Sequence, residues 1–257
     1  MARTPKPPNW TALLRSWDVQ QKSFMPNRER RFTAMLDALG AAVPKPFTAL
    51  DLGSGPGSLS VRLLRRFPSA HVVAVDYDPV TMRIGRGALG NFRGRLTWVD
   101  AKLGSPGWTE RLPHRRIDAA LSTTALHWLP KADLLTLYQD LGHRIRRGGV
   151  FLNGDVMVWG PSSPGFSRLA EKVRRNRYRG RSLTQEFGAW EVWWKRTEKI
   201  AALRPYFEER QRRAAGHPKH EPLLPLEVHE RMLRQAGFRE VGVIWQHFEN
   251  RVLFARR

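Results

Sequence analysis

The stretch Asp51-Leu52-Gly53-Ser54-Gly55-Pro56-Gly57 decides the fold of this chain. It follows a short apolar run, residues 47–50, and precedes an apolar helical face that begins at Leu59. Glycines at alternate positions let the backbone turn sharply and approach a ligand closely. The polar end of such a ligand meets the free N–H groups at the start of the helix. The stretch therefore predicts a strand, a ligand-binding turn and a helix in succession.

The rest of the chain repeats this alternation. From Phe47 to Asp155, short apolar runs alternate with amphipathic stretches, which is typical of βαβ units around a parallel sheet. Further strands are expected at 71–76, 96–99, 117–122 and 150–153. Helical periodicity is present at 28–39, at 134–141 and at 228–233, the last closed by Gly237, and a hairpin is expected over 241–255.

Composition narrows the function classes. The chain has 257 residues, 41% of them hydrophobic, no cysteine and a formal net charge of +21. Disulfides and thiolate metal sites are excluded, and no apolar run reaches the roughly 18 residues of a membrane-spanning helix. Residues 1–8 lack the apolar run of a signal peptide, so a cytoplasmic enzyme is expected. The charge attracts anionic partners, but the arginines are scattered along the chain, which fits a solvated surface as well as a nucleic-acid site.

Two acidic residues favour one ligand over another. A dinucleotide turn requires glycine at position 58, where this chain has Ser58. Asp51 just before the turn would repel a pyrophosphate, but it complements a ligand that carries ammonium and sulfonium charges. Asp76 ends the second strand, where a carboxylate accepts hydrogen bonds from a ribose diol. Together these features favour S-adenosylmethionine over NAD.

With these residues the chain resembles the class I S-adenosylmethionine-dependent methyltransferases, in the group of small bacterial type 11/12 enzymes. The resemblance covers about residues 47–155, with weaker similarity at 28–39 and 226–255. It implies a Rossmann-like α/β fold: a seven-stranded, mostly parallel sheet, an antiparallel last strand and a helical insertion after the fifth strand. Four parts follow: an N-terminal segment (1–27), a cofactor-binding core (28–156), a helical lid or substrate insertion (157–222) and the C-terminal part of the core (223–257).

The resemblance also implies site residues. Gly53, Ser54 and Gly55 would line the methionine moiety, Asp76 the ribose and Tyr77 the adenine face. Asp100-Ala101 would lie at the adenine edge, although a second register places Lys102 there instead of the acid. The complete set of expected cofactor-binding residues is Asp51, Gly53, Ser54, Gly55, Gly57, Asp76, Tyr77, Asp100, Ala101 and Ser122.

His127 is the candidate catalytic residue. It follows the fourth strand, at the sheet edge where ligands of open α/β sheets bind. Two roles are open: a general base or substrate contact, and a structural hydrogen bond beside Trp128. His217, His220 and Glu221 offer a weak metal-ligand pattern, but their loop spacing argues against it, and no metal is expected.

The insertion is expected to form a lid and select the acceptor. Trp190, Trp193 and Trp194 have the spacing of a core-facing helix stripe, and arginines at 174, 175, 177, 179 and 181 would suit an anionic ligand. The predicted function is methylation (EC 2.1.1.-) of an oxygen or nitrogen of a small molecule. The alternative is an RNA methyltransferase or a basic RNA-binding protein with a non-catalytic cofactor domain.

Overall fold

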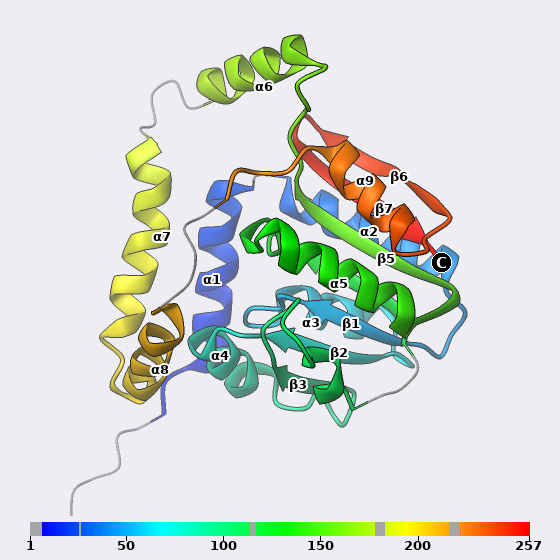
Figure 1. Ribbon diagram of the computed structural model, residues 1–257. Coiled ribbons are helices and arrows are strands. Elements are labelled where there is room, and N and C mark those ends of the chain that lie inside the picture. Colours follow the sequence, from blue (N-terminus) through cyan, green and yellow to red (C-terminus); the bar gives the residue numbers. More distant parts are fainter. Residues whose placement is uncertain (1–6, 26, 114–116, 178–182, 216–220) are drawn as a thin grey trace, which may run out of the picture.

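The protein is described by a computed structural model, over residues 7–25, 27–113, 117–177, 183–215 and 221–257 (Figure 1). One seven-stranded sheet has the order β3-β2-β1-β4-β5-β7-β6. The first five strands are parallel, and β7 is antiparallel to both β5 and β6, as the sequence predicts. The strands are β1 (Thr48–Leu52), β2 (His71–Asp76), β3 (Leu96–Asp100), β4 (Ile117–Thr123), β5 (Ile145–Val156), β6 (Glu240–His247) and β7 (Asn250–Arg256).

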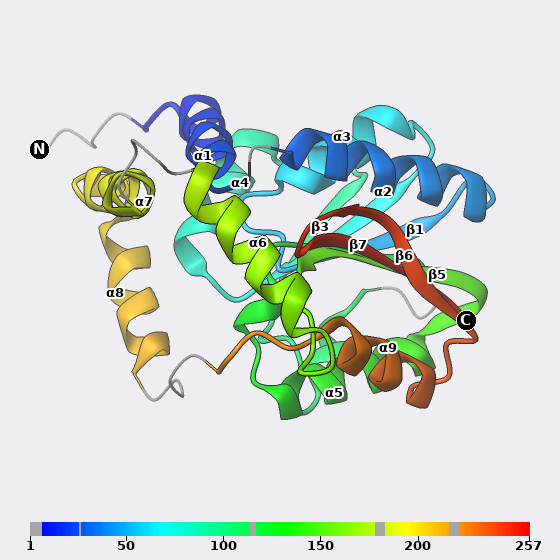
Figure 2. The ribbon, with the colours of Figure 1, turned by 90° about the horizontal axis from the view of Figure 1, so that it is seen from above.

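Helices cover both faces of the sheet (Figure 2). On one face lie α2 (Arg28–Ala42) and α3 (Ser58–Arg66), and on the other α5 (Lys131–Arg144) and α9 (Leu226–Gln235). Successive strand residues serve opposite layers: Ala49 packs with α2 and α3, whereas Leu50 packs with α5 and α9. Both faces of the central strands are therefore buried, which explains why their sequences are continuous apolar runs rather than alternating ones.

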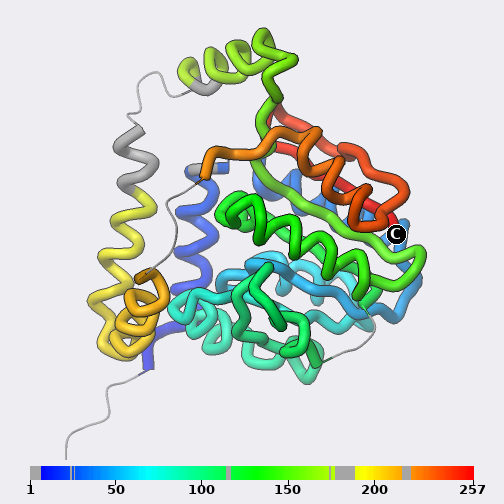
Figure 3. The backbone as a smooth tube through the Cα atoms, viewed as in Figure 1, coloured from blue at the N-terminus to red at the C-terminus, as the bar shows by residue number. Residues whose placement is uncertain are grey.

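A third apolar cluster lies outside this sandwich. It joins α1 (Trp10–Phe24) and α4 (Pro79–Leu89) to the insertion helices α7 (Leu183–Glu198) and α8 (Arg204–Ala214). Helices α1 and α7 stand side by side in Figure 1, with α8 near the lower end of α7. Its buried members are Leu14, Val80, Ile84, Trp193, Leu203 and Phe207. Segments from the beginning and the end of the chain thus share one small core. Helix α6 (Pro164–Arg177) precedes α7 and lies at the top of the view in Figure 3.

Three boundaries differ from the sequence-based expectation. Strand β5 extends to Val156 because its second half pairs with β7 from Val150 to Val156. Helix α2 continues to Ala42 rather than ending at residue 39. The N-terminal segment contains α1, whose start is capped by the Asn9 side chain accepting a hydrogen bond from Ala12 N at 3.0 Å. Short 3₁₀ turns complete the fold: η1 (Trp108–Arg111), η2 (Leu126–Trp128) and η3 (Ala201–Leu203).

Helix α1 runs along the carboxyl edge of the sheet. A Cβ on Gly55 would lie 3.8 Å from the Trp17 ring, so the middle of α1 adjoins the glycine turn. Just past the helix, the Met25 sulfur is 3.2 Å from the Thr124 hydroxyl at the end of β4. The edge where parallel α/β sheets bind ligands is therefore bordered by a helix that the sequence analysis did not assign.

Candidate functional site

The glycine turn has the geometry that its sequence predicts. Gly53 and Gly55 have φ of +66° and +54°, in the left-handed region that glycine adopts without strain. A Cβ on Gly53 would lie 2.3 Å from the Cβ of Ala125, so the turn also approaches the end of β4 too closely for any side chain. Gly57 (φ +85°) caps the start of α3. The turn thus presents backbone rather than side chains at the carboxyl end of β1.

Polar groups beside this turn are buried and incompletely paired. Asp51 is only 1% exposed; its Oδ2 accepts from the N–H and the hydroxyl of Ser60 at 2.9 and 2.6 Å. Among the described residues, Asp51 Oδ1 and the Ser54 hydroxyl have no hydrogen-bond partner. Burial raises the pKa of Asp51 to about 7. Buried polar groups normally find partners, so these two atoms indicate a place for a ligand that supplies them.

Asp76 stands at the end of β2, facing the glycine turn. Its Oδ2 accepts from Gly55 N at 2.6 Å, and its Oδ1 accepts from Tyr77 N and Asp78 N at 2.7 and 2.8 Å. Burial raises the pKa of Asp76 to about 6. A carboxylate offers about four lone-pair sites, so about one remains, on Oδ2. Asp76 both shapes the turn and keeps a site for one further donor, such as a ribose hydroxyl.

The two residues expected beside adenine are engaged by the insertion. Arg213 of α8 forms a bidentate pair with Asp100, with both N–O distances 2.8 Å. Its guanidinium carbon is also 4.6 Å from the centre of the Tyr77 ring. Ala101, the other expected edge residue, is buried, and its N–H donates to Asp76 O at 2.9 Å. The structure thus brings Tyr77 and Asp100 together and covers both with one arginine.

Ser122, the last expected cofactor residue, is fully buried within the sheet. Its hydroxyl donates to Leu52 O at 2.8 Å, across the pair β1–β4. The contact fixes the two central strands to each other next to the glycine turn.

His127 is paired with Asp155, which the sequence did not predict as a site residue. Its Nδ1 lies 2.7 Å from Oδ1 of Asp155, which is buried at the end of β5. Burial opposes charge on the ring, but the Asp155 carboxylate outweighs burial and raises the pKa of His127. Burial likewise acts to raise the pKa of Asp155, and His127 with Arg31 outweighs it, so this pKa is lowered. The pair favours a protonated imidazole beside an ionised carboxylate.

Arg31 of α2 is a second unpredicted member of the site. It is 2% exposed, and its hydrogen bonds within the described part of the chain go to the hydroxyls of Thr123 and Thr124 and to the sulfur of Met25. Burial lowers the pKa of Arg31 to about 10, so the group stays cationic at neutral pH. Its Nε has no partner among the described residues. Its hydrogen-bond partners are neutral groups at the end of β4 and just past α1, and its charge also stabilises the nearby ionised Asp155. A buried cation with an unused donor is suited to an anionic ligand.

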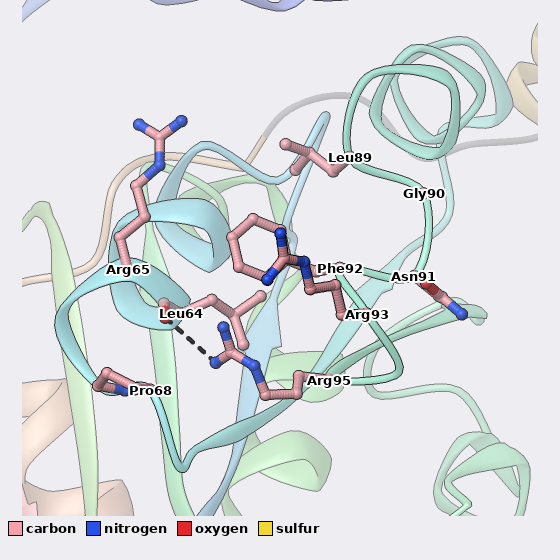
Figure 4. A pocket seen from close by; sticks show the side chains of 9 residues that line it. All are labelled: Leu64, Arg65, Pro68, Leu89, Gly90, Asn91, Phe92, Arg93 and Arg95. Carbon is pink, nitrogen blue, oxygen red and sulfur yellow. Dashed lines mark hydrogen bonds between the residues drawn. The ribbon is translucent and has the colours of Figure 1, made fainter.

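Other features of the chain are farther from the glycine turn or do not form a site among the described residues. A pocket between α3, the end of α4 and the start of β3 is lined by Arg65, Arg93 and Arg95 (Figure 4). Arg95 donates there to Leu64 O. Because Arg95 directly precedes β3, this pocket lies at the amino ends of the strands, opposite the edge with the glycine turn. His217 and His220 lie outside the described residues, whereas Glu221 accepts from Lys131 N at 2.9 Å. Among the described helices, none has the length and apolar character needed to cross a bilayer.

Comparison with known proteins agrees with this geometry. A family model described as a methyltransferase domain matches residues 49–149. The trans-aconitate 2-methyltransferase of Azoarcus sp. (strain BH72) is 34% identical over 137 residues, which are 52% of this chain and 49% of that protein. The protein of the same description from Mycobacterium sp. (strain KMS) is 38% identical over 116 residues, 44% of this chain and 40% of that protein. The chain thus spans about half the length of the relatives it matches.

Solved structures match the fold over a longer range. An O-methyltransferase family protein from Burkholderia thailandensis superposes with a TM-score of 0.56 at 16% identity, covering 99% of this chain and 65% of that one. Sheet order, glycine turn and the family match over residues 49–149 identify this part of the chain as a class I S-adenosylmethionine-dependent methyltransferase domain. Over about half of its length, the chain is similar to the trans-aconitate methyltransferases.

Proposed function

We propose that this protein transfers a methyl group from S-adenosylmethionine to an oxygen of a small anionic acceptor. The observation that carries the proposal is the placement of Arg31 and of the His127–Asp155 pair at the ends of β4 and β5 beside the glycine turn, where Asp155 raises the pKa of His127. The cofactor assignment fits the residues present: a turn that only glycine permits, and buried polar atoms that lack partners in the described chain.

Arg31 would hold the carboxylate of the cofactor. A guanidinium binds a carboxylate through parallel, charge-assisted hydrogen bonds, and this one has an unused Nε. Asp51 would face the ammonium group and Asp76 a ribose hydroxyl through Oδ2. The sulfonium supplies an activated methyl group and a neutral leaving group. What the chain must provide is position, because a displacement requires the nucleophile about 3–3.5 Å from the methyl carbon and in line with the breaking bond.

His127 would position the acceptor. An acceptor carboxylate is already ionised at neutral pH, so no general base is needed to activate it. A protonated imidazole, kept so by Asp155, attracts that carboxylate and orients it toward the methyl group. The curated relatives are named for trans-aconitate, a small organic acid, which supports an anionic acceptor. The net charge of +21 would also attract such molecules.

The insertion, residues 157–222, would act as the lid. Its helices α7 and α8 share a small core with α1, and α1 adjoins the glycine turn. Covering the site excludes water and strengthens polar contacts within it. Replacing 157–222 by a Gly/Ser linker should abolish methylation yet keep S-adenosylhomocysteine binding within about tenfold. Loss of folding or of all cofactor binding would instead identify the insertion as a buttress.

An acceptor panel tests the function directly. Release of S-adenosylhomocysteine would be measured with trans-aconitate and other small di- and tricarboxylates, and with neutral phenols and primary amines of similar size. We expect turnover with carboxylates, and the product should be a methyl ester by mass spectrometry. Turnover confined to phenols or amines would replace the anionic-acceptor proposal.

RNA methylation is the alternative, favoured by the net charge alone. Sequence-selective RNA binding at physiological salt, with transfer of labelled methyl groups to RNA, would establish it.

A further inference from the structure

Arg213 occupies the two groups that a class I cofactor's adenine would need. Its Nη1 and Nη2 each lie 2.8 Å from a different oxygen of Asp100, and Nη1 also donates to Tyr77 O at 2.7 Å. The guanidinium carbon lies over the Tyr77 ring, 4.6 Å from its centre. Tyr77 directly follows β2, and Asp100 is the last residue of the neighbouring strand β3. The two lie close together because Asp76 and Asp100 are register partners in β2–β3. One side chain therefore spans the whole adenine end of the site.

A guanidinium and an adenine can form the same two kinds of contact with Tyr77 and Asp100. Both are flat and stack on an aromatic ring, and both donate N–H groups to a carboxylate in that plane. The bidentate pair uses both oxygens of Asp100, so adenine cannot gain the same contact while Arg213 stays.

The position of Arg213 on α8 allows it to release Asp100. It lies in the last turn of α8, whereas the helix is anchored at its other end by Leu203 and Phe207 in the shared apolar core. Its Nε already donates to Glu209 at 2.8 Å on the same helix, so a partner remains after Asp100 is released. One turn earlier, Arg210 holds Asp78 at 2.7 Å and stacks on Trp194. These contacts keep α8 on α4 whether or not Arg213 is bound to Asp100.

We propose that Arg213 competes with the adenine ring of the cofactor for Asp100 and Tyr77, and so sets cofactor affinity from within the insertion. Cofactor binding then displaces the last turn of α8, which joins the lid to the cofactor end of the site. The inference rests on the proposed cofactor site but not on the acceptor.

Calorimetry with S-adenosylhomocysteine tests the competition. Arg213→Ala should bind it about three- to tenfold more tightly than the wild type, because a partly exposed ion pair no longer has to be broken. Arg212→Ala is the matched control. Arg212 lies on the same helix, its side chain is 74% exposed, and it pairs with Glu209 rather than with Asp100, so its removal should change the affinity less than about twofold. Arg213→Met keeps the packing over Tyr77 and provides the same test if the alanine variant folds poorly.

Two further measurements separate the outcomes. Raising sodium chloride from about 50 to about 500 mM weakens the ion pair, so wild-type affinity should rise relative to that of Arg213→Ala and the difference between the two proteins should shrink. Methylthioadenosine has adenine but no amino-acid end. It should also bind about three- to tenfold more tightly to Arg213→Ala than to the wild type. Equal or weaker binding by the Arg213 variants overturns the competition and makes Arg213 a wall of the pocket. Failure of every protein to bind either ligand overturns the cofactor site and this inference together.

Discussion

The two ends of the cofactor site differ in how their polar groups are satisfied. At the glycine turn, Asp51 Oδ1, the Ser54 hydroxyl and Arg31 Nε are buried without partners among the described residues. At the other end, Arg213 pairs with both oxygens of Asp100 and lies over the Tyr77 ring. The first end is arranged in advance for a ligand, and the second must exchange one partner for another. Changes at the first end should therefore cost affinity, and removal of Arg213 should increase it.

The largest expected effect is at Arg31. Arg31→Met should weaken S-adenosylhomocysteine binding about 100-fold, since it removes charge-assisted hydrogen bonds worth roughly 1.5–3 kcal/mol each. Arg31→Lys should restore part of the loss. The matched control is Arg30→Met, an exposed neighbour on α2, which should bind like the wild type. Calorimetry on variants with unchanged melting curves measures this, and an Arg31→Met protein of normal affinity would remove Arg31 from the site.

Asp76 should follow. Asp76→Ala removes the acceptor for the ribose and a support of the Gly55 turn, so affinity should fall by roughly 1.5–3 kcal/mol, or about 10- to 100-fold. NAD should neither bind nor raise the melting temperature of the wild type. A calorimetric response to NAD without one to S-adenosylhomocysteine would contradict the cofactor assignment.

The His127–Asp155 pair predicts the pH dependence of turnover. Asp155 raises the pKa of His127 above 6.5, so the cation that holds the acceptor is lost as the pH rises through this raised pKa. With a carboxylate acceptor, kcat/KM should fall over this range, and Asp155→Asn should move the fall to lower pH. His127→Gln should lose about 10- to 100-fold in kcat/KM and the pH dependence with it. A rate that increases with pH would instead make His127 a base for a protonated acceptor.

Asp51 predicts a smaller effect, on stability. Its folded pKa of about 7 lies above the ordinary value of 3.8, so the stability that its protonated form contributes is lost as pH rises between these values. At pH 8 the free energy of unfolding of Asp51→Asn should exceed that of the wild type by on the order of 1–3 kcal/mol, and the difference should shrink as the pH falls from about 7 toward about 4. Urea titrations at both pH values measure this, and a variant less stable at pH 8 would show that the ionised carboxylate is stabilised in the fold.

The weakest expected effect concerns nucleic acid. If the net charge of +21 is a general surface property, RNA affinity should be independent of sequence and collapse between low and physiological salt. Filter binding at several salt concentrations measures the slope, and selective binding that survives physiological salt would favour the RNA alternative.

Much of the molecule follows from local sequence. The apolar runs, the alternating glycines and Asp76 each have one physical reading: buried strands, a left-handed turn and an acid at a strand end. They predicted the parallel strands and the position of the glycine turn. Asp51 and Ser58 were needed as well to favour S-adenosylmethionine over NAD, and the seven-stranded sheet was implied by the family resemblance. Helix α1 was also within reach, because Asn9 is a capping residue followed by Trp10, Leu13, Leu14 and Trp17 at helical spacing.

Tertiary structure alone decided which distant residues meet. Asp155 reaches His127, Arg31 reaches the end of β4, and Arg213 reaches Asp100 across 113 positions of the chain. No periodicity reports such pairs, because an exposed arginine and a buried one have the same local sequence signal. Sequence determined where the cofactor edge is. The packing of α1, α2 and α8 onto that edge decided which charges surround it, since burial and partner distance, not residue type, set what each charge does.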